Sequence, residues 1–237
     1  MKILVFGLGS IGSRHARNLM MLRSDFVIIG VDPNPSCWWK SPVELAYFDW
    51  RDALVAHPNA DAAIIASPTE AHLDQAMALH DAGIPFYIEK PIGTPDQIAQ
   101  FERLNAGRCA VGYQYRFHPV YCEAAPVIRR NKHVHFIAND ELLDRYGPEC
   151  SNVISAHPID IALWLLGPAI DIYMETNGFS VHGEIIHERG ISGHNYRIDT
   201  GPRRSIVSTE RRTGSTTWSL DACNEMYLDA LSAWLAW

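Results

Sequence analysis

The sequence predicts an α/β protein in which a doubly wound parallel sheet is followed by a smaller α+β domain with a mostly antiparallel sheet. In the first half of the chain, short apolar runs alternate with helical patterns. In the second half, short alternating segments are separated by glycine and asparagine. The pattern changes near His118-Pro119, so we expect one domain over residues 1–118 and a second, shortened domain over residues 119–237.

Five apolar runs predict the strands of the parallel sheet, because strands covered on both faces are almost continuously apolar. These runs are residues 2–6, 26–31, 62–66, 85–88 and 109–115. Helical spacing and capping residues predict the helices between them, at residues 10–22, 70–81 and 96–104. Thr69 is expected to cap the helix over 70–81, and Gly83 lies just beyond its end.

The second domain is expected to consist of helices packed on an antiparallel sheet. Residues 133–138 alternate like a strand, and residues 170–218 predict several short antiparallel strands. Helices are expected at residues 120–130, 158–166 and 224–234. An antiparallel sheet in a small domain often has one face left to bury, which favours a homo-oligomer formed through this sheet. Three tryptophans are either anchors of that interface or part of a monomer core: Trp218, Trp234 and Trp237.

Composition and charge exclude several classes of partner. The formal net charge is -7, whereas phosphate binding by a nucleic-acid partner needs clustered Lys and Arg. No run approaches the roughly 20 apolar residues that cross a bilayer, and Gly7 and Gly9 interrupt the first apolar run before it resembles a signal peptide. The five cysteines are widely spaced and form no CxxC, which favours reduced thiols in the cytoplasm and no metal site.

The segment Gly7-Leu8-Gly9-Ser10-Ile11-Gly12 matches the G-x-G-x-x-G pattern, follows a predicted strand and opens a predicted helix. In a dinucleotide-binding Rossmann domain, Gly7 allows the tight turn, Gly9 lets a pyrophosphate approach the backbone, and Gly12 lets the helix pack close to the strand. Free N–H groups at the helix start then face the phosphate charge. The alternative interpretation is a structural turn, with the aspartate after the second strand serving as a helix N-cap.

Asp32 ends the second predicted strand about 20 residues after the last glycine of the loop, as the fingerprint requires. A carboxylate there accepts hydrogen bonds from the adenosine ribose and repels a 2′-phosphate, which favours NAD over NADP. Arg14, inside the first helix, is the residue that could weaken this preference. Trp38-Trp39 either flank the adenine or have a packing role.

Four further segments resemble the Gfo/Idh/MocA oxidoreductases, which include glucose–fructose oxidoreductase and inositol dehydrogenase. They are Ser67-Pro68-Thr69 with His72, Glu89-Lys90-Pro91-Ile92-Gly93, the segment from Gly112 to Pro119, and His157-Pro158-Ile159-Asp160 followed by Trp164-Leu165-Leu166-Gly167. The resemblance covers the first 120 residues well and the rest in patches. Each segment alone is weak, and their combination and order are specific.

The resemblance implies that Lys90 lies beside the nicotinamide and hydrogen-bonds the reacting hydroxyl or carbonyl oxygen, where an ammonium stabilises alkoxide charge. It implies that His157 donates or accepts the proton, and that Asp160 orients His157 or binds a sugar hydroxyl. Tyr113 and Arg116 would line the substrate cleft. The cofactor set that it implies, beside the glycine loop and Asp32, is Ser67, Thr69, His72, Glu89 and Lys90.

Structural interpretations of the same residues remain open. Lys90 could be a solvated loop lysine, and His157 could cap a helix or fill an interior position. Asp160 could be a first-turn acid favoured by the helix dipole. His72 could lie on an exposed helix face. Tyr113 and Arg116 could fix the domain junction instead of a substrate.

The second half departs from the family pattern. Val153 and Ile154 occupy the positions where the family usually has an acid before the catalytic histidine, and Asp144 or Glu149 could substitute for it. The chain is also shorter than typical members, so the second domain is expected to be trimmed.

The resulting expectation is an NAD(P)-dependent oxidoreductase that transfers hydride between a sugar, cyclitol or nucleotide-sugar and nicotinamide. One alternative is a catalytically silent nucleotide-binding subunit or sensor of the same fold. The other is an NAD-assisted glycoside hydrolase.

Overall fold

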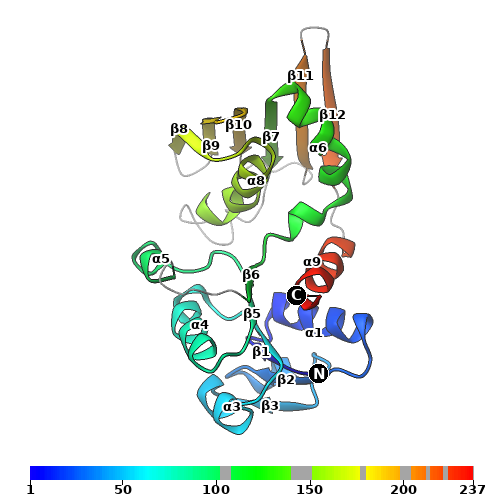
Figure 1. Cartoon of the computed structure of the whole chain (residues 1–237), viewed down its shortest axis with the longest axis vertical. Coiled ribbons are helices and arrows are strands. Elements are labelled where there is room, and N and C mark those ends of the chain that lie inside the picture. The colour runs from blue at the N-terminus through cyan, green and yellow to red at the C-terminus, as the bar shows by residue number, and fades with distance from the viewer. Residues whose placement is uncertain are drawn as a thin grey trace. The chain divides into compact units, whose positions relative to one another are not determined.

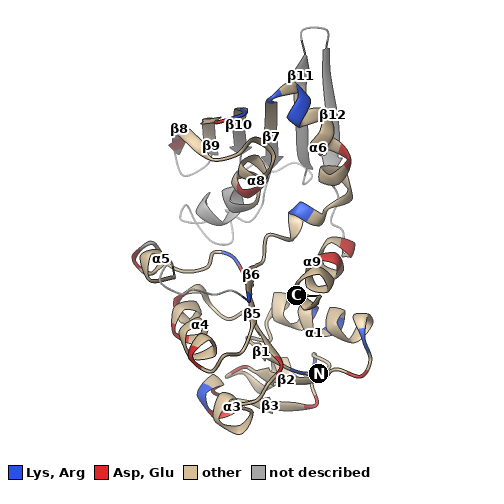
Figure 2. Cartoon of the chain, in the orientation of Figure 1, with Lys and Arg blue, Asp and Glu red and all other residues tan. Residues whose placement is uncertain are grey.

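A computed structural model describes residues 1–101, 108–139, 151–176, 180–197, 204–211, 214–220 and 224–236. The chain divides into two compact units (Figure 1). Unit 1 comprises Met1–Gly112 and Tyr227–Trp237, and unit 2 comprises Tyr113–Met226. Figure 2 shows basic residues interspersed with acidic residues along the described elements of both units. Within the described ranges, no helix has the length and apolar character that crossing a membrane requires.

Unit 1 contains a six-stranded parallel sheet with the order β3-β2-β1-β4-β5-β6. Its strands are β1 (Lys2–Phe6), β2 (Val27–Val31), β3 (Leu45–Tyr47), β4 (Ala62–Ile65), β5 (Phe86–Ile88) and β6 (Cys109–Val111). From β1 the chain adds strands toward one edge of the sheet, and from β4 it adds them toward the other edge, so β1 and β4 form a topological switch point. Ligands of open α/β sheets bind beyond the carboxyl ends of strands at such a point. The predicted doubly wound sheet is confirmed.

Different helices cover the two faces of this sheet, because successive side chains of a strand point to opposite faces. Ile3 and Val5 pack in one core with residues of α1 and α9, and Leu4 and Phe6 pack in the other with residues of α3 and α4. The helices of unit 1 are α1 (Ser10–Leu22), α2 (Pro35–Trp38), α3 (Trp50–Ala56), η1 (Thr69–Ala71), α4 (His72–Asp81), α5 (Pro95–Phe101) and α9 (Glu225–Leu235).

The last helix packs on the first sheet, whereas we expected it in the second domain. Leu231 is fully buried and Trp234 is 7% exposed in the core beside α1. The Trp234 ring lies 5.8 Å from the ring of Tyr87 in β5. The apolar side of α9 therefore covers part of the parallel sheet, and for Trp234 the structure supports the interpretation as part of a monomer core.

Unit 2 contains a six-stranded sheet with the order β12-β11-β7-β10-β9-β8, in which β7 and β10 are parallel and the other neighbours are antiparallel. Its strands are β7 (His133–Asn139), β8 (Ala169–Thr176), β9 (Ser180–His187), β10 (Gly190–Arg197), β11 (Arg204–Arg211) and β12 (Gly214–Leu220). Its helices are η2 (Gln114–Phe117), α6 (Pro119–Asn131) and α8 (Ser151–Leu166). Residues of α6 and α8 share a buried core with Val134 and Phe136 of β7. The mostly antiparallel second sheet is confirmed.

Two predicted helix starts were wrong. Thr69 begins the short 3₁₀ helix η1 instead of capping α4, and within the described residues 67–81 no side chain caps either helix. Helix α8 begins at Ser151, so Pro158 lies inside it, not in its first turn. A proline inside a helix removes one backbone hydrogen bond, and the strongly apolar α8 tolerates that loss because tertiary packing holds it.

Candidate active site

The glycine loop joins β1 to α1, and its shape requires glycine at two positions. Gly7 has φ +85°, and a Cβ atom there would lie 2.5 Å from the carbonyl oxygen of Ala66. A Cβ atom on Gly12 would lie 1.8 Å from the carbonyl oxygen of Gly7. Both positions therefore allow the helix and the strand ends to approach closely.

The start of α1 is open on the side that a diphosphate would approach. A Cβ atom added to Gly9 would meet no described atom within 4 Å. Within the described residues 1–101, no side chain caps α1 and no acidic residue lies in its first turn, which Ser10 and Ile11 begin. Uncapped N–H groups at a helix start are an anion-binding arrangement, so the loop fits a dinucleotide.

Asp32 directly follows β2, and its carboxylate holds the glycine loop. Oδ2 accepts a hydrogen bond from the Leu8 amide at 2.8 Å, and Oδ1 accepts one from the Asn34 amide at 2.8 Å. Each carboxylate oxygen retains a further lone pair with which it can accept a ribose hydroxyl. The Trp38 indole N–H donates to the Asp32 carbonyl at 2.9 Å. Arg14 lies over the Tyr227 ring, with 4.9 Å between the guanidinium carbon and the ring centroid.

Trp38 and Trp39 lie in different surroundings. The Trp38 ring packs on Phe48 with a centroid separation of 4.5 Å, whereas Trp39 is 86% exposed. The packing interpretation of this pair therefore holds for Trp38.

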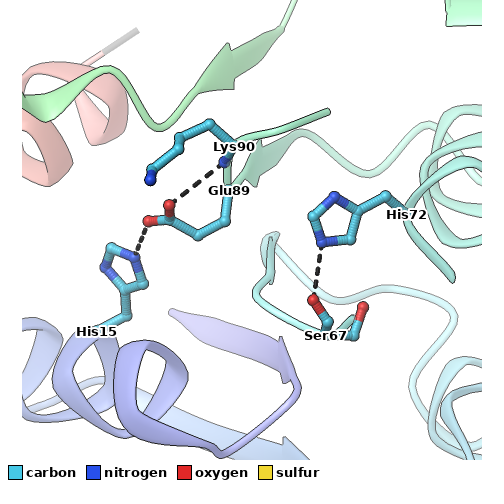
Figure 3. Close-up of polar contacts among 5 residues, drawn as sticks. All are labelled: His15, Ser67, His72, Glu89 and Lys90. Atoms are coloured by element: carbon cyan, nitrogen blue, oxygen red, sulfur yellow. Dashed lines mark hydrogen bonds and ion pairs between the residues drawn. The ribbon is translucent and has the colours of Figure 1, made fainter. Parts of the chain in front are cut away.

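Glu89 and Lys90 come directly after β5, and the Lys90-Pro91 peptide bond is cis. The Glu89 carboxylate is buried: Oε1 lies 2.8 Å from Nε2 of His15 in α1, and Oε2 accepts the Lys90 amide at 3.3 Å (Figure 3). A Cβ atom on Gly112 would lie 3.0 Å from the Glu89 carboxyl carbon, so the carboxylate occupies the space left by this glycine.

Sequence reasoning missed His15, because its helical spacing marks only a position on the apolar face. The available signal was its polarity, since a buried polar side chain requires a hydrogen-bond partner.

His72 connects two segments at the carboxyl edge of the first sheet (Figure 3). Its Nε2 lies 2.9 Å from the Ser67 carbonyl oxygen, and its Nδ1 lies 3.0 Å from the Pro91 carbonyl oxygen. The side chain is 1% exposed, so the interpretation as an exposed helix residue was wrong. Burial lowers the pKa of His72, and the two carbonyl oxygens oppose that shift because they stabilise the protonated ring.

In unit 2, Arg116 of η2 pairs with Asp160 of α8. Its Nε donates to Oδ2 at 2.8 Å, and its Nη2 donates to Oδ1. Asp160 is only 5% exposed, and this burial raises its pKa while the guanidinium acts in the opposite direction. Asp160 lies well past the first turn of α8, so it is not a first-turn acid. The Arg116 guanidinium also lies 5.7 Å from the ring centroid of Tyr113.

His157 lies within α8 and is half-buried, so the helix-cap interpretation was wrong. Its ring centroid is 4.3 Å from that of Tyr115 in η2. The side chains of Val153 and Ile154, and all of Asp144 and Glu149, lie outside the described residues.

The chain is similar to a known protein family and to curated relatives. Residues 1–108 match the family model for an oxidoreductase family with an NAD-binding Rossmann fold. The scyllo-inositol 2-dehydrogenase (NAD(+)) of Bacillus subtilis is 28% identical over 204 residues, which are 77% of this chain and 57% of that protein. Inositol 2-dehydrogenase 2 of Saccharopolyspora erythraea is 29% identical over 187 residues, which are 72% of this chain and 55% of that protein. The chain therefore spans little more than half the length of these curated relatives.

A solved structure shares the fold. The WlbA (WbpB) dehydrogenase of Thermus thermophilus, in complex with NAD and UDP-GlcNAcA, has a TM-score of 0.80 and 18% identity, and the match covers 100% of this chain and 88% of that one. A likeness at this identity supports the α/β architecture described above.

Proposed function

Residues 1–108 belong to the Gfo/Idh/MocA oxidoreductase family, which has an NAD-binding Rossmann fold. From this premise we propose that the chain is an NAD-dependent oxidoreductase of a cyclitol or sugar. The observation that carries the proposal is the open glycine loop at the switch point of the parallel sheet. Bound NAD supplies the hydride acceptor, and the protein supplies binding and orientation. The cyclitol is favoured over a nucleotide-sugar because the two relatives above carry the name of inositol dehydrogenases.

The residues of the first unit hold the nucleotide. Amides at the start of α1 bind the diphosphate, and Asp32, fixed by its two backbone hydrogen bonds, accepts the ribose hydroxyls. Arg14 lies over Tyr227, which leaves Asp32 to favour NAD over NADP. Ser67 and His72 support the nucleotide site through the backbone, because His72 contacts the Ser67 carbonyl after β4 and the Pro91 carbonyl beside Lys90. Thr69 lies in η1, between these two residues.

Lys90 of unit 1 and His157 of unit 2 each carry the role toward a substrate hydroxyl that the family resemblance implies. The Lys90 ammonium stabilises the negative charge that develops on the oxygen as hydride leaves the carbon. The role assigned to the His157 imidazole is to accept the hydroxyl proton as a general base. Asp160 acts by holding Arg116 over Tyr113, and these two side chains contact the substrate.

Lys90→Ala tests this assignment. Turnover of NAD+ with myo-inositol or scyllo-inositol should fall by about 10²–10³-fold, as expected for one lost oxyanion donor. The dissociation constant for NADH, measured by fluorescence titration, should stay within about twofold. Lys2→Ala, at the amino end of β1, is the matched control and should leave both values unchanged. Full turnover in Lys90→Ala contradicts the role of Lys90.

A protein that binds NADH and oxidises no cyclitol or sugar would contradict the proposal and favour a silent nucleotide-binding protein. Glycoside cleavage without net NADH formation would favour the NAD-assisted hydrolase. The cytoplasmic location inferred from the cysteines stays a prediction.

Self-association through the second sheet is the remaining part of the proposal. Three large apolar side chains on one face of its strands β8 to β10 are exposed: Tyr173, Ile186 and Ile191. A second copy of the chain would remove this apolar surface from water. Light scattering of the pure protein tests this, and a monomer at all concentrations contradicts it.

A further inference from the structure

His15 and Glu89 form a buried polar pair behind the lysine segment. The His15 side chain is fully buried and that of Glu89 is 10% exposed, with 2.8 Å between Nε2 and Oε1. A carboxylate only accepts hydrogen bonds, so Nε2 of the imidazole carries the proton. The two residues come from α1 and from the end of β5, and they are 74 positions apart in the sequence.

The surroundings of His15 leave Glu89 as the group that orients the imidazole. Its ring lies 5.3 Å from the Tyr87 ring and 6.0 Å from the Tyr227 ring, both at steep angles. Among the described residues, its Nδ1 has no hydrogen-bond partner. A position that only filled space would be better served by an apolar side chain, because a buried imidazole gives up its hydration. The presence of histidine here therefore indicates a requirement for the Glu89 contact.

Glu89 transmits this contact to Lys90. Its second carboxylate oxygen accepts the Lys90 amide at 3.3 Å, and its own amide donates to the Ile65 carbonyl at 2.9 Å. On the other side of the lysine, the Pro91 carbonyl oxygen lies 3.0 Å from Nδ1 of His72. The Lys90 backbone is therefore flanked on one side by Glu89, which contacts His15 of α1, and on the other by Pro91, which contacts His72 of α4.

We propose that His15 is a positioning residue. It acts through Glu89 and holds the Lys90 backbone at a fixed position relative to α1, the helix that begins at the glycine loop. The inference rests on the proposed function of Lys90. Helix α1 carries both His15 and the amides that face the diphosphate, so one rigid element sets the place of the nucleotide and of the lysine. His15 would thereby fix the lysine relative to the nicotinamide without touching either.

Hydrogen exchange of the whole ligand-free chain tests the link directly. In His15→Leu, exchange in residues 86–92 should accelerate by about 10-fold relative to the wild type, because loss of the anchor permits local opening. Exchange in β4, the neighbouring strand Ala62–Ile65, should not change. His15→Gln, whose amide N–H can donate to Glu89, should restore most of the protection.

His187→Leu is the matched control for the loss of a buried histidine. His187 is 3% exposed and hydrogen-bonds the Gly167 carbonyl and the Ser192 hydroxyl in unit 2. Its loss should leave exchange in residues 86–92 unchanged. Equal acceleration in both variants would show a general loss of stability and would overturn the inference.

Kinetics then separate positioning from binding. With NAD+ and myo-inositol, kcat of His15→Leu should fall by up to about 10²-fold, the cost of a misplacement near 1 Å. KM for NAD+ should stay within about twofold, and His15→Gln should recover most of kcat. If Lys90→Ala abolishes turnover but His15→Leu leaves kcat and exchange at wild-type values, the positioning role is wrong and the proposed function stands. Full turnover in Lys90→Ala would overturn the proposed role of Lys90 and the inference with it, whereas a wild-type protein that oxidises no cyclitol or sugar would overturn the proposed function.

Discussion

Removing the guanidinium of Arg116 should leave a buried carboxylate without its partner. Asp160 is 5% exposed and receives both donors of the Arg116 fork. In Arg116→Met the apolar stem remains, so the lost interaction is that of the charge with the Asp160 carboxylate. The carboxylate must then take up a proton or stay charged in an environment that already raises its pKa.

The expected cost follows from the burial of the two partners. Breaking a buried ion pair by removing one member costs about 3–5 kcal/mol. The Arg116 side chain is 41% exposed, so water near the pair weakens the interaction, and we expect about 2–3 kcal/mol. Asp160→Asn should cost about 1–2 kcal/mol, because the amide keeps one acceptor and the arginine can reach water. The double variant should show a coupling energy of about 1–2 kcal/mol.

Urea unfolding near neutral pH, followed by circular dichroism and tryptophan fluorescence, measures these free energies. Arg129→Met is the matched control, since Arg129 is exposed in the same unit and lies over the Trp164 ring. Its cost should remain below about 1 kcal/mol. Equal costs for the Arg116 and Arg129 variants, or strictly additive costs in the double variant, would refute the reasoning.

Three further outcomes are expected. Gly12→Ala should weaken NADH binding by about 100-fold, or about 2.7 kcal/mol, because its Cβ would lie 1.8 Å from the Gly7 carbonyl oxygen. An unchanged titration would show that the loop does not bind the nucleotide. Trp234→Ala should destabilise the protein by about 3–5 kcal/mol, since it empties a core position that is 7% exposed; an unchanged urea midpoint would contradict the packing of α9. The pKa of His72 is lowered in the folded protein, so as pH falls this residue is protonated in the unfolded chain before it is protonated in the folded protein. The contribution of His72 to stability is therefore complete above the ordinary histidine pKa of about 6.5 and is lost as pH falls toward the pKa of the folded state. His72→Gln should therefore flatten the fall of the urea midpoint between about pH 7.5 and 5, and an identical slope in wild type and variant would be evidence against it.

The parallel sheet was predictable where burial on both faces makes a strand continuously apolar, as in Lys2–Phe6. The edge strand Leu45–Tyr47 escaped prediction because its side chains are partly exposed and alternate too briefly to form a pattern. Periodicity predicted the helix over residues 224–234 but not the sheet on which it packs, because an amphipathic stripe does not identify its partner.

The glycine loop was predictable because its geometry is local. Side-chain contacts between residues far apart in the sequence were not predictable. The His15–Glu89 and Arg116–Asp160 contacts join residues 74 and 44 positions apart. The spacing rules that reveal a helix face or a turn carry no information at such separations.

The return of α9 to unit 1 has a consequence for the order of folding during synthesis. The chain leaves unit 1 after Gly112 and re-enters it at Tyr227, so every residue of unit 2 is translated before the last helix emerges from the ribosome. Until then, the core around Tyr87 lacks Leu231 and Trp234. A nascent chain arrested between these points would expose that apolar side of the nucleotide domain, and we expect chaperones that recognise apolar surface to bind it at that stage.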